Sequence, residues 1–189
     1  ILDLDADGYM DCALLTSDAT GCRYRRLFGN GTGTLAADPA VEAESVGTGN
    51  GDWVLCDVTG DGAQELLVLS PERNQLTLFE APGREPLRHL QTVTIPGGPK
   101  AISTLKGEPG QPPILAVAIT RGEQKGVLIG SFSRTDPNGP LTWATQHKIP
   151  LPVVPIALES ADMDLNGLED LVVLGLTSEG GIEGRLVPV

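Results

Sequence analysis

The stretch DLDADGYMDCALLT, residues 3–16, joins a short acidic loop to an apolar run with the length of a β-strand. Carboxylate side chains occupy alternate positions of the loop, Gly8 follows the third of them, and Asp11 ends the loop. The same order of residue types returns as DVTGDGAQELLVLS at 57–70 and as DMDLNGLEDLVVLG at 162–175. Three copies of one loop and strand indicate an internal repeat.

The spacing of the loop glycine gives the length of this repeat. Gly62 follows Gly8 by 54 residues and Gly167 follows Gly62 by 105, close to twice that interval. A fourth copy is expected in between, and LKGEPGQPPILAVA at 105–118 has the glycine and the strand without the acidic residues. A period of roughly 50 residues is the range of propeller blades. The approximate repeats are 1–49, 50–98, 99–152 and an incomplete 153–189.

Each repeat predicts several short strands. The chain has 24 glycines and 15 prolines and shows no helical period, which favours strands joined by tight turns. An apolar segment precedes the loop and a further strand follows the first one, at 24–28, 76–79, 127–132 and 185–189. About four strands per repeat make one antiparallel blade. The predicted fold class is therefore all-β, a single partial β-propeller over residues 1–189.

An open arc of blades is not a closed propeller. Known propellers close with at least four blades. The chain begins at Ile1 in mid-strand, without an initiator Met or a signal peptide. We therefore expect that the remaining blades come from the same polypeptide or from a partner chain.

Charge and hydropathy exclude two classes of partner. The formal net charge is -12 with 13 Lys and Arg, whereas a nucleic-acid surface needs clustered basic residues. No apolar run approaches the roughly 20 residues of a membrane span. Cys12, Cys22 and Cys56 lack metal or redox spacing, and they are read either as buried thiols in strands or as one disulfide with a spare thiol.

The three acidic loops have the composition of calcium sites. Calcium takes six to eight oxygen ligands, and a tight loop supplies them from alternate side chains and a backbone carbonyl. We predict up to three structural Ca²⁺ ions, which would bring the formal charge from -12 to -6. The expected side-chain ligands are Asp3, Asp5, Asp7 and Asp11, then Asp57, Thr59, Asp61 and Glu65, then Asp162, Asp164, Asn166 and Asp170, with the carbonyls of Tyr9, Ala63 and Leu168.

Two alternatives to this interpretation were weighed. Asp and Asn also cap turns without any metal. An EF-hand is disfavoured, because the distal Glu is missing and a strand follows the loop where an EF-hand has a helix. Ligand charge predicts that the first loop binds calcium most tightly and the second loop least tightly.

The form DxDxDGxxD before an apolar strand resembles the FG-GAP/VCBS repeats of integrin alpha-subunit propellers and of bacterial secreted proteins. The segment RLFGNGTGTL at 26–35 is similar to the strand and turn of such repeats. The resemblance implies a larger, seven-bladed ring with calcium in each competent blade. In the third repeat Leu105, Gly107, Pro109 and Pro113 stand at the ligand positions, so we predict a turn without metal there.

No catalytic constellation is visible, so we do not expect an enzyme. His89 and His147 are the only histidines, and neither lies in a recognised motif. Trp53 and Trp143 are expected to pack between blades, with sugar stacking as the alternative. The cationic segment 23–26 is expected to be a solvated strand, with a patch for an acidic ligand as the alternative.

The predicted function is an extracellular, calcium-stabilised scaffold for protein, cell-adhesion or polysaccharide binding. The expected location is the cell surface or the medium after secretion, with the periplasm also compatible. One alternative is the scaffold or cleft of a secreted polysaccharide lyase or hydrolase. Another is a structural subunit of an extracellular assembly.

Overall fold

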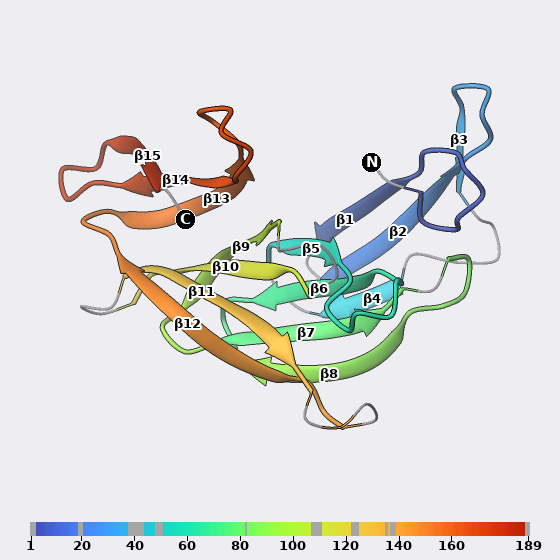
Figure 1. Cartoon of the computed structure of the whole chain (residues 1–189), viewed down its shortest axis with the longest axis horizontal. Helices are drawn as coiled ribbons and strands as arrows, with labels where there is room; N and C mark the ends of the chain where they lie inside the picture. Colours follow the sequence, from blue (N-terminus) through green and yellow to red (C-terminus); the bar gives the residue numbers. More distant parts are fainter. Residues whose placement is uncertain are drawn as a thin grey trace.

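The protein is built of β-strands alone in the part of the chain that the structure describes (Figure 1). The computed structural model describes residues 3–18, 21–37, 44–47, 51–81, 83–106, 111–121, 125–134, 136 and 139–187. Over these residues, fifteen strands form four antiparallel sheets that follow one another along the chain.

The first two sheets hold residues 12–47 and 53–94. In the first sheet the order is β1-β2-β3, with β4 also paired to β2, and in the second it is β5-β6-β7-β8. The strands are β1 (Cys12–Asp18), β2 (Gly21–Gly29), β3 (Leu35–Ala37), β4 (Glu44–Gly47), β5 (Trp53–Cys56), β6 (Glu65–Ser70), β7 (Gln75–Glu80) and β8 (Arg88–Thr94).

The third and fourth sheets hold residues 99–150 and 154–187, in the orders β9-β10-β11-β12 and β13-β14-β15. The strands are β9 (Pro99–Leu105), β10 (Ile114–Ile119), β11 (Gly126–Ser133), β12 (Thr142–Pro150), β13 (Val154–Ala161), β14 (Asp170–Leu176) and β15 (Ile182–Val187). The strands predicted at 24–28, 76–79 and 127–132 lie within β2, β7 and β11.

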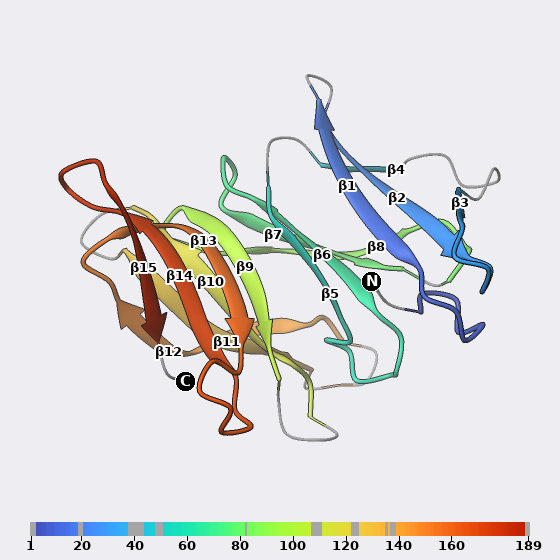
Figure 2. The ribbon, with the colours of Figure 1, turned by 90° about the horizontal axis from the view of Figure 1, so that it is seen from above.

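The four sheets are arranged as the blades of a β-propeller, which confirms the predicted all-β fold. Figure 2 shows the sheets side by side, from the first in blue to the last in red. The strands that open the later sheets are neighbours: β5 contacts β9, and β9 contacts β13. The larger, seven-bladed ring stays a prediction.

Each pair of successive sheets encloses an apolar layer. Strand β6 explains why the sequence reads as a continuous apolar run, because all of its residues are buried. Its side chains alternate, so that Leu66 and Val68 pack toward the first sheet, while Leu67 and Leu69 pack toward the third. The layer between the third and fourth sheets contains Ala116, Ala118, Val127, Ile129, Leu158, Leu171 and Val173.

The three acidic loops occupy equivalent places in their sheets. In the second sheet the loop joins β5 to β6, and in the fourth it joins β13 to β14. In the first sheet the loop leads directly into β1, so β1 corresponds to β6 and β2 corresponds to β7. The register supports this equivalence, because Cys12 lies opposite Leu27 as Leu66 lies opposite Phe79.

Two remaining expectations concern membranes and cysteines. Among the described residues, the search for helices long and apolar enough to cross a bilayer finds none. All three cysteines are thiols, with Cys12 partly buried in β1, Cys22 buried in β2 and Cys56 buried at the end of β5.

Candidate metal-binding loops

The backbone of the three loops is the same at the positions that set the turn. Counting from the first acidic residue, the sixth position is Gly8, Gly62 or Gly167, with φ of 88°, 88° and 89°. An L-residue with a side chain rarely adopts this conformation, and glycine adopts it freely. The fourth position is also left-handed, at Ala6 (φ 59°), Gly60 (φ 76°) and Leu165 (φ 60°).

The carboxylate at the first position closes the turn in each loop. Its Oδ2 accepts a hydrogen bond from the amide nitrogen of the sixth residue. The distances are 2.9 Å from Gly8 to Asp3, 2.8 Å from Gly62 to Asp57 and 2.9 Å from Gly167 to Asp162. The first residue is therefore fixed with its carboxylate over the centre of the loop backbone.

The side chain at the fifth position forms a smaller turn. Its oxygen accepts a hydrogen bond from the amide of the seventh residue, which is the geometry of an Asx turn. The distances are 2.8 Å from Tyr9 to Asp7, 2.8 Å from Ala63 to Asp61 and 2.7 Å from Leu168 to Asn166. These side chains are exposed in all three loops.

The carboxylate at the ninth position is buried, which distinguishes it from the others. Asp11, Glu65 and Asp170 are 0%, 1% and 6% exposed. Each accepts a hydrogen bond from the amide of the second loop residue: 2.7 Å from Leu4, 2.9 Å from Val58 and 3.3 Å from Met163. A buried carboxylate is costly unless hydrogen bonds and a positive charge offset the lost hydration.

The first loop brings three predicted ligands together. Asp3, Asp5 and Asp11 each offer a carboxylate oxygen, and these oxygens lie within 4.8 Å of one another. Among the described residues this is the one group of three such side chains at that spacing. Asp7 is not part of the group, since its carboxylate is exposed and its Oδ1 accepts the bond from Tyr9.

The other two loops gather their ligands less closely. The second loop has Thr59 at the third position, and the Thr59 Oγ1 lies 3.4 Å from both Asp57 Oδ1 and Glu65 Oε1. In the third loop the amide of Asn166 bonds to Asp164, at 3.0 Å from Nδ2 to Oδ2. Asp162, Asp164 and Asp170 do not meet the 4.8 Å spacing of the first loop.

The second loop shows the electrostatic consequence of burial. Burial raises the pKa of Glu65 to about 7, against hydrogen bonds from the Thr59 and Val58 amides that lower it, and the charges of Asp61 and Asp57 raise it further. Burial, then the charges of Glu65 and Asp57, raises the pKa of Cys56 to about 12, so this thiol stays neutral. The loop is an acceptor for a cation rather than a reactive thiol site.

The degenerate loop of the third sheet joins β9 to β10. Leu105 ends β9, and Pro113 directly precedes β10. Gly107 and Pro109 lie outside the described residues, so the prediction of a glycine and proline turn without metal remains a prediction.

Two contacts of the first loop come from residues that its motif does not contain. The amide of Gly29, at the end of β2, donates to Asp11 Oδ1 at 2.8 Å. Arg84 of the second sheet forms an ion pair with Asp5, at 2.7 Å between Nε and Oδ2. Sequence spacing within a repeat gives no signal for either contact, because both depend on how strands and sheets pack.

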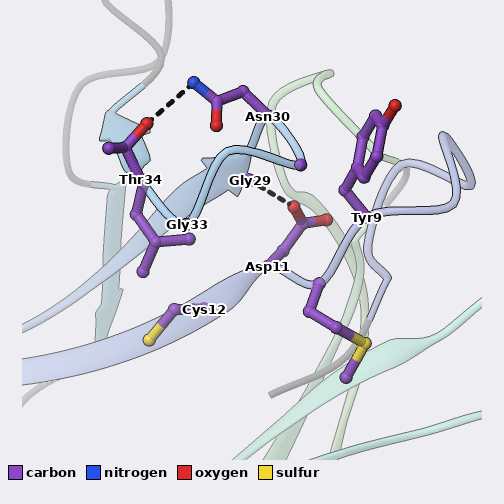
Figure 3. Close-up of a pocket in the computed structure, with 10 residues that line it drawn as sticks. Tyr9, Asp11, Cys12, Gly29, Asn30, Gly33 and Thr34 are labelled. Atoms are coloured by element: carbon purple, nitrogen blue, oxygen red, sulfur yellow. Dashed lines mark hydrogen bonds between the residues drawn. The ribbon is translucent and has the colours of Figure 1, made fainter.

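A pocket of about 360 Å³ adjoins the first loop, lined by Tyr9, Asp11 and the turn that follows β2 (Figure 3). Figure 3 shows Asp11 directed at Gly29 and the side chain of Asn30 joined to that of Thr34, at 2.7 Å. The polar groups of the pocket are thus already engaged in holding the turn against the loop. The pocket contributes a support for Asp11 rather than a separate set of ligands.

The histidines and tryptophans lie on strands. His89 packs against the Phe79 ring at a centroid distance of 5.8 Å, and His147 is exposed on β12. Trp53 contacts Tyr24 of the first sheet at 6.2 Å, as expected for packing between blades. Trp143 packs against Phe132 of its own sheet at 5.5 Å, beside the layer that the second and third sheets share.

The cationic segment 23–26 divides between two faces of β2. Arg23 and Arg25 are exposed, whereas Arg26 is buried. The Arg26 guanidinium donates to the carbonyl oxygens of Gly83 and Glu85 in the second sheet. This segment is therefore partly a contact between sheets, and only two of its arginines face solvent.

The fold and the repeated loops define the chain as a β-propeller. No protein-family model matches the chain. A search of curated proteins also finds no sequence similar to it.

Proposed function

We propose that this chain is a calcium-stabilised propeller scaffold of the FG-GAP/VCBS type that acts outside the cell and binds a protein or a polysaccharide. The observation that carries the calcium part is the buried carboxylate at the ninth position of three loops, each beside further oxygen ligands. Turn capping accounts for the first and fifth positions. It does not account for a buried ninth carboxylate beside other acidic groups, since a turn needs no such charge.

The donor set fits calcium. All the side-chain donors are oxygens, and calcium prefers six to eight of them. Each carboxylate that accepts one backbone hydrogen bond retains lone pairs for a cation. Asp3, Asp5 and Asp11 would hold the ion in the first loop, Asp57, Thr59 and Glu65 in the second, and Asp162, Asp164 and Asp170 in the third.

The role proposed for calcium is structural. A divalent cation would offset the repulsion among ten clustered acidic residues of the 25 in the chain. Sites with the affinity usual for extracellular modules, in millimolar calcium, would add about 1.4 kcal/mol each, or about 4 kcal/mol for three. This is a large share of the stability of a marginal domain.

Extracellular action follows from the metal. Sites of millimolar to submillimolar affinity are filled where calcium is abundant, which is outside the cell. The scaffold role is the remaining function for a fold whose described loops hold acidic ligand sets rather than a nucleophile and base. Loops on one face of the propeller would contact the protein or polysaccharide partner.

The test is a thermal melt of the chain in millimolar calcium and in excess EDTA, with magnesium as the control cation. We expect calcium to raise Tm by about 8–16 °C, from about 4 kcal/mol and the usual scaling for a chain of this size. Magnesium should give a much smaller rise, because it demands a tighter, octahedral site. Equal melts in calcium and EDTA would reduce the aspartates to turn residues.

The binding role has its own test. The calcium-loaded chain would be passed over immobilised acidic and neutral polysaccharides and over extracellular-matrix proteins. Retention without change in the length of the polysaccharide supports a scaffold. Cleavage of the polysaccharide would instead make the chain part of a lyase or hydrolase.

A further inference from the structure

Arg84 reaches from one blade into the metal loop of the blade before it. It lies in the connection between β7 and β8 of the second sheet, and its Nε donates to Asp5 Oδ2 at 2.7 Å. A second guanidinium nitrogen lies 4.0 Å from Asp7 Oδ2. Asp5 is a member of the group of three carboxylates, so the arginine shares an oxygen with the candidate site.

The position of Arg84 is set by contacts on both sides. Its guanidinium lies over the Phe28 ring of the first sheet, 4.3 Å from the centroid. In return, Arg26 of the first sheet donates to the carbonyl oxygens of Gly83 and Glu85, the two residues that flank Arg84. A Cβ added at Gly83 would lie 3.6 Å from the Asp5 Cα, which shows how closely the connection approaches the loop.

The first loop differs from the others in this respect. The ion pairs recorded for the described residues include none between a basic side chain and an acidic residue of the second or third loop. The first loop has four carboxylates, whereas the other two have three each. On ligand charge alone it would bind a divalent cation most tightly, and Arg84 acts against that advantage.

We propose that Arg84 is an intramolecular competitor that lowers the affinity of the first loop for a divalent cation and thereby couples this site to the contact between the first two blades. The inference rests on the proposed calcium function and goes beyond it. A cation that takes the Asp5 oxygen weakens the ion pair with Arg84, and by linkage the ion pair weakens cation binding by the same factor.

The expected size of the effect is limited by exposure. The Arg84 side chain is 53% exposed, whereas that of Asp5 is 8% exposed. Exposed ion pairs are weak because water and salt screen them. Removal of the arginine charge should therefore tighten cation binding at the first loop by about fivefold, and not by orders of magnitude.

Terbium is a suitable probe because the first loop alone has an aromatic residue at its seventh position. Tyr9 stands where the other loops have Ala63 and Leu168. Terbium luminescence excited through Tyr9 would report the first loop separately, and Tyr9→Phe would verify that assignment by loss of the signal. Calcium is then measured by its displacement of terbium.

The experiment compares wild type with Arg84→Gln and with the matched control Arg73→Gln. Arg73 lies on the second sheet in the turn between β6 and β7, at the end of β6 away from its loop, and its change removes the same charge. Arg84→Lys keeps the charge and loses the planar contact with Phe28. Melting curves in EDTA verify that each variant is folded.

The proposal expects about fivefold tighter binding of terbium and calcium by Arg84→Gln at low salt, with Arg73→Gln equal to wild type. The difference should shrink when salt rises from about 10 mM to about 0.5 M, which a merely structural role would not produce. Equal or weaker binding by Arg84→Gln overturns the inference while calcium binding stands. Absence of binding by wild type overturns the proposed function and this inference together.

Discussion

The buried carboxylate of Glu65 has the clearest chemical signature of any single residue in the loops. It is 1% exposed, accepts hydrogen bonds from two backbone amides and lies beside two further aspartates. Burial raises its pKa to about 7 from the ordinary value of 4.5. In the metal-free protein this residue therefore holds a proton at pH values where an exposed glutamate has lost it.

The raised pKa of Glu65 predicts a pH dependence of stability. The folded state binds the extra proton between pH 4.5 and about 7, so the stability that this proton supplies is complete below that window and lost as pH rises through it. Glu65→Gln is neutral throughout and keeps an oxygen for the two amides. In EDTA it should be more stable than wild type above pH 7, by up to about 3 kcal/mol, and about equal near pH 4.5.

Urea unfolding followed by tryptophan fluorescence, in EDTA at about pH 5 and about pH 8, measures this difference. In calcium the sign should reverse, because Glu65→Gln removes a charged ligand. A stability difference that is the same at both pH values would show that the Glu65 carboxylate does not titrate in this window.

The loops are the elements in which backbone geometry and ligand chemistry are combined. Alternate side chains point to one centre only because the chain turns sharply at the fourth and sixth positions. Gly167 meets this requirement at no steric cost, with φ of 89°. Leu165 meets it with strain, since it is non-glycine at φ 60° and its side chain is 88% exposed.

Two substitutions in the third loop should change stability in opposite directions. Gly167→Ala should cost about 1–2 kcal/mol, because the left-handed conformation disfavours a Cβ. No atom lies within 4 Å of the added Cβ, so the cost is conformational rather than steric. Leu165→Gly should stabilise the protein by up to about 1 kcal/mol for the converse reason.

Chemical denaturation in calcium measures both variants, and Leu168→Ala at an exposed position of the same loop is the control. A neutral Gly167→Ala would mean that the loop adopts another backbone in solution. The calcium proposal would then lose its geometric basis in the third loop.

The whole molecule is held together by apolar layers between sheets and by a polar contact across each boundary. Arg84 joins the second sheet to the first, and the amide of Lys106 donates to Glu169 Oε2 at 2.6 Å between the third and fourth sheets. Between the second and third sheets, the buried Ile102 amide donates to Asp52 Oδ2 at 3.0 Å. Asp52 Oδ1 also accepts from the Trp53 amide, at 2.9 Å.

Asp52 is therefore predicted to stabilise the contact between two blades. Asp52→Ala leaves the Ile102 amide without its acceptor and should cost about 1–3 kcal/mol of unfolding free energy. Asp52→Asn keeps one oxygen acceptor and should cost less. Urea midpoints of the two variants, compared with wild type, test this prediction, and an unchanged midpoint for Asp52→Ala would show that water replaces the carboxylate without penalty.

The sequence by itself determined the repeat, the strands and the turn positions of the loops. A period of about 50 residues and apolar runs with the length of strands are local properties, so they predicted an all-β propeller without any knowledge of packing. The glycines at 8, 62 and 167 were equally readable, because only local backbone geometry requires them.

Only the tertiary structure decided which loop oxygens come together and what else touches them. Asp3, Asp5 and Asp11 form a group, although Asp162, Asp164 and Asp170 have the same residue types at the same positions. Asp5 and Arg84 are 79 residues apart and meet because two sheets pack face to face. Spacing within a repeat is set by one chain segment, whereas burial and charge at a site are set by every segment that packs around it.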